Sequence, residues 1–340
     1  MGSLRARVAQ SLRELVAASY GLRVDWSEMS ASKLEAVLKE LPDMPPWPRE
    51  VYALLLRERG GVTKRIALIT AKREPVALLG LRSNRGVWEP VTHWILPHAL
   101  FPVRDGLLFQ CLAAIGFPVR IGWWRWEALP PRSPLITKLH CGPRYSAKLD
   151  TNHEQYWRKS GNMDNVKSMR NRCKTFRLLV NLRGAAEWTI RNSEAKWRAG
   201  GVSQMPDLED RLEVVKYLED CGLHYTLTLM DGERPAGGHL FLADGKCLVW
   251  HTTYKDPSYD WHGVGVRLLD LAFQWGAESG FEELDVGGLF DYKKRWAPEC
   301  GLRCEFETYH PVLRCLDQTF TPMFAMARSA KSWAAARQNR

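Results

Sequence analysis

Two glycines at the start of a helix-like segment have the spacing of a phosphate-binding turn. Gly263-Val264-Gly265 follows an apolar run at 247–254 and a polar loop. The first N–H groups of a helix lack intrahelical partners, and glycine lets an anion approach them closely. An ordinary tight turn into a helix explains the pattern equally well, and a dinucleotide fingerprint would need a third glycine. The predicted phosphate contacts are Gly263, Val264, Gly265 and Val266.

The elements that would position this turn follow the order strand, glycine turn, helix, strand. The apolar run at 247–254 predicts the first strand, and Leu268, Leu271 and Trp275 recur at helical spacing after the turn. Gly280 is a plausible helix end, and 281–286 predicts the second strand. An anion bound at the helix start would therefore lie beside the ends of two strands.

Two ionisable residues on these strands could do acid–base chemistry. The imidazole of His251 has an intrinsic pKa suited to a general base, although a histidine inside a strand is more often a structural residue. Asp285 ends the second strand, where α/β sites collect ligands. Its carboxylate could equally cap the turn at Gly287-Gly288. Both residues are therefore candidates, each with a structural alternative.

The stretch around these residues resembles the acetyltransferase domain of the GNAT superfamily. The resemblance covers roughly residues 150–298 and is strongest to the cellulose-biosynthesis-type (CelD-like) branch, which is related to the Fem peptidyltransferases. The motifs that carry it are Asp231-Gly232, the Asp256-Pro257 loop, Gly263, Asp285 and Tyr292-Lys293. The superfamily usually has Gln or Arg three residues before the first glycine of its phosphate turn, and Asp260 occupies that position here.

The resemblance implies an acyl-CoA N-acyltransferase fold, with acetyl-CoA or another acyl-CoA as the donor and no metal. It implies that the strands at 247–254 and 281–286 splay apart around the thioester. Tyr292 would then protonate the departing thiolate, and Lys293 would hold a phosphate or an acceptor carboxylate. A basic helix within 152–182 matches one that precedes the second half of such proteins. The predicted contacts of an acceptor or a phosphate are Arg170, Lys174 and Arg295.

Composition limits the class of protein and of partner. The chain has 340 residues, of which 48 are Lys or Arg and 38 are Asp or Glu, so its formal net charge is +10. An excess of basic residues favours anionic partners such as CoA, nucleotide-linked sugars, tRNA or an acidic membrane surface, or simply keeps the protein soluble. We expect a small-molecule or saccharide acceptor and no DNA.

Cysteine usage and hydropathy predict a cytoplasmic protein. The eight cysteines are scattered, and Cys300-x3-Cys304 has no second pair to complete a zinc site. Free buried thiols in a reducing compartment are the expected state. No apolar run reaches the length of a membrane span, and the first residues lack the apolar core of a signal peptide.

The order of elements repeats along the chain and predicts a mixed α/β fold with two GNAT-like halves in tandem. Strands at 65–70, 76–81 and 119–124 with a helix at 107–115 match strands at 224–230, 237–242, 247–254 and 281–286 with the helix from Gly263. Strands are also predicted at 188–191 and 302–309, and a helix at 208–218. The predicted division is an N-terminal helical segment (1–49), a degenerate half (50–150), a donor-binding half (151–312) and a C-terminal helix with a basic tail (313–340).

Three functions fit these observations. The leading one is an acyl-CoA-dependent N- or O-acyltransferase that acts on a sugar, nucleotide-sugar or polysaccharide-related acceptor. The second is a Fem-type transferase that uses aminoacyl-tRNA, and the third is a non-catalytic GNAT-fold subunit of a polysaccharide assembly. No HExxH, GxSxG or GKS/T motif is present, which argues against a metalloprotease, a serine hydrolase and a P-loop NTPase.

Overall fold

A computed structural model describes most of the chain. The described residues are 2–26, 30–41, 49–56, 64–84, 87–92, 101–104, 106–126, 133–201, 208–288, 291–315 and 318. Most of the predicted C-terminal helix and basic tail (313–340) therefore lies outside the described residues. The predicted chain break at 43–48 lies there too.

The first half of the described chain alternates helices with strands of the central sheet. Its elements are α1 (Gly2–Ser19), β1 (Leu22–Asp25), α2 (Ala31–Glu40), α3 (Arg49–Leu56), β2 (Lys64–Ala71), β3 (Glu74–Asn84), β4 (Val87–Pro90), α4 (Leu108–Ala114), β5 (Val119–Trp126) and β6 (Ile136–Lys148). The side chain of Ser30 caps α2, because it accepts a hydrogen bond from the backbone N–H of Lys33.

The second half repeats this order after one additional helix. Its elements are α5 (His153–Lys159), α6 (Met163–Arg172), β7 (Arg177–Val180), α7 (Ala185–Ala199), α8 (Leu208–Asp220), β8 (His224–Asp231), β9 (Arg234–Asp244), β10 (Cys247–Lys255), η1 (Pro257–His262), α9 (Val264–Glu278), β11 (Glu283–Gly288), η2 (Asp291–Arg295) and β12 (Glu299–Thr308). The predicted fold class, a mixed α/β fold with a repeated unit, is thus confirmed.

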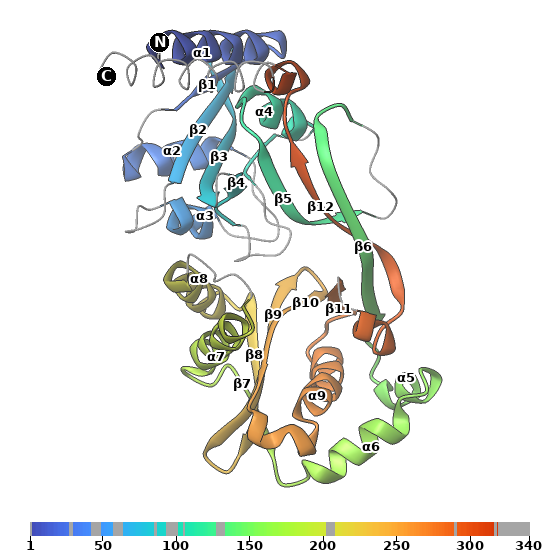
Figure 1. Ribbon diagram of the computed structural model, residues 1–340. Helices are drawn as coiled ribbons and strands as arrows, with labels where there is room; N and C mark the ends of the chain where they lie inside the picture. The colour runs from blue at the N-terminus through green and yellow to red at the C-terminus, as the bar shows by residue number, and fades with distance from the viewer. Residues whose placement is uncertain are drawn as a thin grey trace, which may run out of the picture.

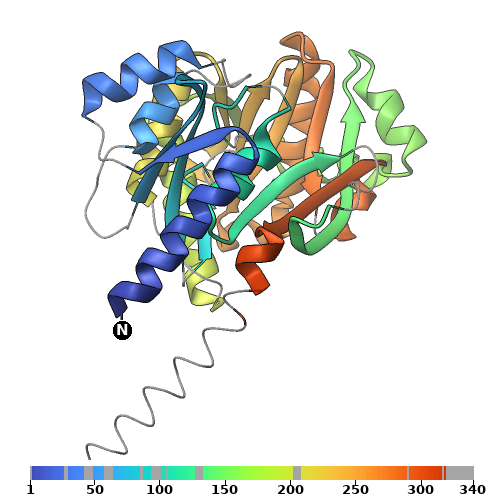
Figure 2. The same cartoon turned by 90° about the horizontal axis from the view of Figure 1, so that it is seen from above.

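The described strands form one mixed sheet of twelve, in the order β1-β2-β3-β4-β5-β12-β6-β11-β10-β9-β8-β7. Figure 1 shows two lobes, one holding β1–β5 and the other β7–β11, with the long strands β6 and β12 running between them. Seen from above in Figure 2, the strands of both lobes follow one another around a single twisted sheet.

The two halves exchange their last strands. β6 ends the first half, yet it pairs with β11 of the second half, for example Ala147 with Leu284. β12 ends the second half, yet it pairs with β5 of the first half, for example Phe306 with Ile121. β6 and β12 also pair with each other along their length. Each half is therefore completed by a strand from the other.

Glycines in β9 let helices pack closely on both faces of the second half. A Cβ atom on Gly237 would lie 2.5 Å from Val264 of α9, and one on Gly238 would lie 2.1 Å from Thr189 of α7. Consecutive strand residues point to opposite faces. Therefore α9 covers one face of β9 and α7 covers the other.

The halves also share a hydrophobic core. The buried cluster around β2, β3 and α4 includes Val214 and Leu218 of α8 and Leu242 of β9. A second buried cluster lies under α9 and is centred on Trp157, Phe273 and neighbouring residues of β10 and β11. Because the first cluster contains residues from both halves, folding buries the two halves against each other.

Several local predictions were wrong. Residues 188–191 lie inside α7 and are helical, because Ala186, Ile190 and Ser193 are buried at helical spacing. The basic helix α6 ends at Arg172, and β7 follows it. Strands β1, β4, β6 and β7 were not predicted.

The prediction of free thiols was also wrong for one pair. Cys141 of β6 and Cys304 of β12 form a disulfide. These residues are directly opposite each other in the paired strands. The six other cysteines form no disulfide.

Candidate functional site

Strands β10 and β11 separate after a short paired region. Their parallel pairing runs from Cys247–Glu283 to Val249–Asp285, whereas β10 continues to Lys255. Two irregularities accompany the separation, one in β10 between Trp250 and Thr252 and one in β11 after Asp285. Bulges of this kind bend a strand away from its neighbour. One edge of β10 is therefore left open in the middle of the sheet.

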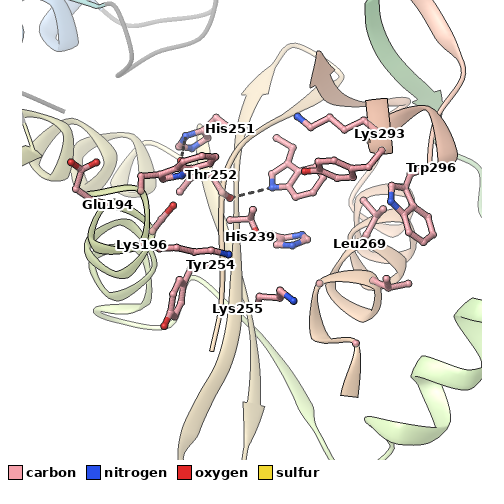
Figure 3. Close-up of a pocket in the computed structure, with 18 of the residues that line it drawn as sticks. Glu194, Lys196, His239, His251, Thr252, Tyr254, Lys255, Leu269, Lys293 and Trp296 are labelled. Carbon is pink, nitrogen blue, oxygen red and sulfur yellow. Dashed lines mark hydrogen bonds between the residues drawn. The ribbon is translucent and has the colours of Figure 1, made fainter. Parts of the chain in front are cut away.

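A cavity of about 570 Å³ opens at this edge. Its described lining comes from α7, α8, β9, β10, α9 and η2, and is Ser193, Glu194, Lys196, Trp197, Arg211, His239, Trp250–Lys255, Gly263, Gly265, Val266, Leu269, Tyr292, Lys293 and Trp296. Figure 3 shows Glu194, Lys196 and Tyr254 on one side of β10, and Leu269, Lys293 and Trp296 on the other. The lining described here has four cationic side chains and one carboxylate, so the cavity favours an anionic ligand.

The start of α9 forms one wall of the cavity. Gly263 has φ +67° and joins η1 to α9, and a Cβ atom there would lie 1.8 Å from the sulfur of Met169. Gly265 has open space around its Cβ position and lines the cavity. Val266 also lines it, whereas Val264 is buried against Gly237. The predicted turn thus places the first N–H groups of a fifteen-residue helix beside the cavity.

A buried ion pair holds α9 against α6. The guanidinium of Arg170 donates to both carboxylate oxygens of Asp270, with Nε at 2.9 Å and Nη2 at 2.8 Å. Asp270 is 2% exposed and also accepts a hydrogen bond from the indole of Trp157 at 3.0 Å. Hydrogen bonding to Asp270 raises the pKa of Arg170. Arg170 therefore orients the helix whose N-terminus reaches the cavity, and it does not line the cavity itself.

The other two predicted basic contacts also lie outside the lining. Arg295 of η2 stacks on the ring of Trp296 and donates to the side-chain oxygen of Asn162. Lys174 is exposed just after α6. The structure thus brings the predicted helix start, His251, Tyr292 and Lys293 together, and leaves Arg170, Lys174 and Arg295 around the periphery.

Lys293 and Tyr292 face the cavity from η2. Burial, and after it the charge of Arg303, lower the pKa of Lys293 to about 8, although Asp285 acts in the opposite direction. The ammonium also lies 5.4 Å from the centre of the Trp250 ring. Tyr292 is 54% exposed, and partial burial raises the pKa of its phenol. At neutral pH the phenol therefore carries its proton and can donate it.

Asp285 is buried behind the cavity. Its Oδ1 accepts a hydrogen bond from the backbone N–H of Gly287 at 2.6 Å, and its Oδ2 lies 3.3 Å from Nη1 of Arg144. Gly287 has φ +80°, and a Cβ atom there would lie 3.0 Å from Nζ of Lys293. Asp285 therefore shapes the turn beneath Lys293 and acts on the cavity through the charge of that lysine.

His251 sits in the β10 bulge with both ring nitrogens engaged. Its Nδ1 lies 3.2 Å from Nη2 of Arg211 and 3.0 Å from the hydroxyl of Thr252, and its Nε2 lies 3.0 Å from Nε2 of His224. Burial lowers the pKa of His251 well below 6.5, and His224 and Arg211 lower it further. The imidazole is therefore neutral, and neither nitrogen is directed at a ligand.

Sequence reasoning missed His239 and Arg211. His239 of β9 is 1% exposed, and its ring stacks on Trp250 with centroids 4.5 Å apart. Burial lowers the pKa of His239 to about 3, so the ring is neutral. Burial also lowers the pKa of Arg211 to about 10, while Glu194 opposes the shift. A histidine in the otherwise apolar strand 239–243 and an arginine on the apolar face of α8 were the available signals.

Comparisons with known proteins agree with this geometry. Residues 160–294 match the family model described as an acetyltransferase (GNAT) domain. No curated protein matches the chain. Among solved structures, L-PGS from Bacillus licheniformis superposes with a TM-score of 0.52 at 15% identity, covering 84% of this chain and 93% of that chain. At this identity the likeness concerns the fold.

Two further solved structures are similar over most of the chain. FemX has a TM-score of 0.48 at 10% identity and covers 87% of this chain and 99% of its own. A tandem GNAT protein from the clavulanic acid biosynthesis pathway has a TM-score of 0.47 at 12% identity and covers 84% and 98%. The match of residues 160–294, which hold the open strand edge and the glycine turn, supports an acyltransferase of the GNAT type.

Proposed function

We propose that the chain transfers an acyl group from acyl-CoA to an amine or hydroxyl of a saccharide-related acceptor. The observation that carries the proposal is the start of α9, because its first turn, at Gly263, Gly265 and Val266, borders a cavity with an excess of cationic side chains. A pyrophosphate fits both the helix dipole and that charge. The open edge of β10 then offers its backbone to the pantetheine arm.

Asp260 occupies the position where GNAT proteins usually have Gln or Arg, and it does not oppose the binding of CoA at the glycine turn. Asp260 lies 2.6 Å from Nζ of Lys255, so its charge is compensated by a neighbouring cation. Arg172 supports the same loop, because it donates to the backbone oxygen of Trp261 at 2.9 Å and stacks on its ring. The turn can therefore accept a phosphate even though Asp260 replaces a basic or amide residue.

The roles that we propose follow the placement of each side chain. Tyr292 donates a proton to the departing thiolate, and Lys293 attracts an anionic group of the acceptor or the donor. Asp285 holds the turn under Lys293, and His251 acts through its neighbours. The acceptor enters from the α7 side, where Trp197 is 46% exposed and Tyr254 packs on Trp188. Exposed aromatic faces beside polar groups suit a sugar ring.

We further assign the protein to the CelD-like branch, with a role in polysaccharide biosynthesis in the cytoplasm, where acyl-CoA is found. In the described chain, no helix is both long and apolar enough to cross a membrane. The Cys141–Cys304 disulfide is an observation against a cytoplasmic location, because disulfides are rare there.

A Fem-type reaction with aminoacyl-tRNA is the second candidate, favoured by the net charge of +10. Calorimetric titration with acetyl-CoA, with CoA and with bulk tRNA separates the two. We expect acetyl-CoA and CoA to bind with a dissociation constant below about 1 mM and tRNA to bind weakly, with a strong dependence on salt. Absence of CoA binding at millimolar concentration would remove the acyl-CoA function and leave the tRNA reaction or a non-catalytic role.

A further inference from the structure

A chain of polar side chains runs from the cavity wall to the surface of α8. It begins at Thr252, which lines the cavity, and continues through His251 and His224 to Glu219. The successive distances are 3.0 Å from the Thr252 hydroxyl to Nδ1 of His251, 3.0 Å between the two Nε2 atoms, and 3.5 Å from Nδ1 of His224 to Oε1 of Glu219. The side chain of Glu219 is 24% exposed, so the chain ends in contact with solvent.

The hydrogen bonds of this chain have one consistent direction. Arg211 only donates, and its Nη2 contacts both Nδ1 of His251 and the hydroxyl oxygen of Thr252. Nδ1 of His251 must therefore accept, so the neutral ring carries its proton on Nε2. That proton is donated to Nε2 of His224, whose own proton is then on Nδ1 and faces the Glu219 carboxylate. Both hydrogen bonds thus point from the cavity toward His224, whose Nδ1 has no hydrogen-bond partner and faces the Glu219 carboxylate at 3.5 Å.

The neighbouring residues keep the imidazoles of His224 and His251 neutral and hold the Glu219 carboxylate beside His224. Burial lowers the pKa values of His224 and His251, and Arg211 of α8 lowers both. Glu219 acts in the opposite sense on His224. Glu194 of α7 acts on Arg211 and opposes the lowering of the Arg211 pKa. The hydroxyl of Thr226 in β8 donates to Glu219 at 2.8 Å, which fixes the carboxylate beside His224.

We propose that Thr252, His251, His224 and Glu219 form a proton relay that serves acyl transfer in the cavity. The inference rests on the proposed function and adds the route taken by the acceptor's proton. As the acceptor nitrogen or oxygen bonds to the acyl carbon, its proton passes to the Thr252 oxygen while the hydroxyl proton of Thr252 passes to Nδ1 of His251. The Nε2 proton of His251 passes to His224, and the Nδ1 proton of His224 passes to Glu219.

Collapse of the adduct breaks the carbon–sulfur bond, and the thiolate leaves with the electron pair and takes the proton of Tyr292. The proton held by Glu219 then returns along the same chain, Thr252 releases one proton to solvent in the cavity, and the exposed phenolate of Tyr292 takes one proton from solvent. The starting tautomers are thereby restored, and the sum is acyl-CoA plus acceptor giving acylated acceptor plus CoA thiol. Thr252 is the catalytic residue of the relay, and the other three move the proton behind it.

The first test needs no substrate. Nitrogen-15 NMR of histidine-labelled protein should show His251 protonated on Nε2 and His224 protonated on Nδ1 at neutral pH, with His239 as an internal reference outside the relay. The reverse tautomer at either residue overturns the proposal. If acetyl-CoA fails to bind, the proposed function is lost. The tautomers of His251 and His224 still decide whether the hydrogen bonds of the relay point from Thr252 toward Glu219.

The second test measures release of the CoA thiol from acetyl-CoA, with glucosamine and with water as probe nucleophiles. Glu219→Gln keeps the shape but cannot take a proton, and it should lower kcat at least tenfold with calorimetric CoA affinity unchanged. Glu219→Asp should retain more activity than Glu219→Gln, and His224→Ala should regain activity with added imidazole. Glu209→Gln, on the same helix and paired with Arg191, is the matched control. A Glu219→Gln enzyme whose kcat and solvent isotope effect both match wild type refutes the relay.

Discussion

Glu89 of β4 is buried between two arginines and lies 3.6 Å from Nη1 of Arg120 on β5. Its other oxygen lies 3.5 Å from Nη2 of Arg82 on β3. β4 and β5 of the first half correspond to β10 and β11 of the second, and one parallel bridge, Trp88–Val119, is described between them. In the first half an ion pair therefore spans the position that is an open cavity in the second.

This difference predicts one donor site per chain. Calorimetric titration with CoA should give a stoichiometry of one, because the first half has no GxG sequence at its helix start and an ion pair joins β4 to β5 there. Arg120→Ala should lower the free energy of unfolding by about 2–4 kcal/mol, since it removes one partner of a buried carboxylate. It should leave the affinity for CoA unchanged. A stoichiometry of two would contradict the assignment of the donor to the second half.

The two glycines of the helix start should respond differently to substitution. Gly265→Val places its side chain in open space, so the melting temperature should change little. The added methyl groups block the approach of a phosphate and should weaken CoA binding at least tenfold. Gly263→Val instead meets the sulfur of Met169 and a φ of +67°, and should destabilise the protein itself. Thermal melts and calorimetry on both variants check this contrast.

Tyr292→Phe should separate catalysis from binding. If the phenol protonates the thiolate, its removal should lower kcat by about 10²–10⁴-fold while CoA affinity stays within about twofold. The ring is half exposed, so the loss of its hydroxyl should leave stability nearly unchanged. Single-turnover kinetics with acetyl-CoA measure the chemical step directly, and a rate within threefold of wild type would remove Tyr292 from the mechanism.

Lys293 should make stability depend on pH between about 8 and 10.5. The folded pKa is near 8 and the unfolded value is 10.5, so within this window the unfolded chain holds a proton that the folded chain has lost. Stability therefore rises with pH across the window, by at most about 3 kcal/mol, and the contribution is constant below it. Urea unfolding at pH 8 and pH 10 should show this rise in wild type relative to Lys293→Met.

The same lysine should affect the acceptor more than the donor. Lys293→Ala should raise KM for an anionic acceptor, with a smaller effect on kcat.

In the unfolding experiment on Lys293→Met, the other groups that titrate between pH 8 and 10.5, including tyrosines, are present in both proteins and cancel in the comparison of unfolding free energies. If the free energy of unfolding depends on pH equally in wild type and Lys293→Met, the Lys293 ammonium lies in an environment similar to water and the prediction is wrong.

Local sequence patterns predicted the elements that carry the proposed donor site. The strand expected at 247–254 is β10 (Cys247–Lys255), and the helix expected from Gly263 is α9 (Val264–Glu278). These elements follow from periodicity and glycine placement, which are local. The failure at 188–191 arose because a short apolar run fits a strand or a buried helix face equally well.

Features that depend on distant residues could not be predicted from local patterns. Arg170 has the appearance of a surface cation until Asp270 is placed beside it. Cys141 and Cys304 are 163 residues apart, and they meet because β6 and β12 are neighbours. The His251 site likewise depends on His224 and Arg211, which come from a separate strand and helix.

The exchange of β6 and β12 sets the order in which the chain can fold during synthesis. β5 lacks its neighbour until residues 299–308 have left the ribosome, so the first half has an exposed strand edge while the second half is being made. Neither half can complete its sheet alone, and folding of the nascent chain finishes with the last strand of that sheet. A ribosome that stalls before residue 299 therefore leaves an aggregation-prone product, although most of the protein is already present.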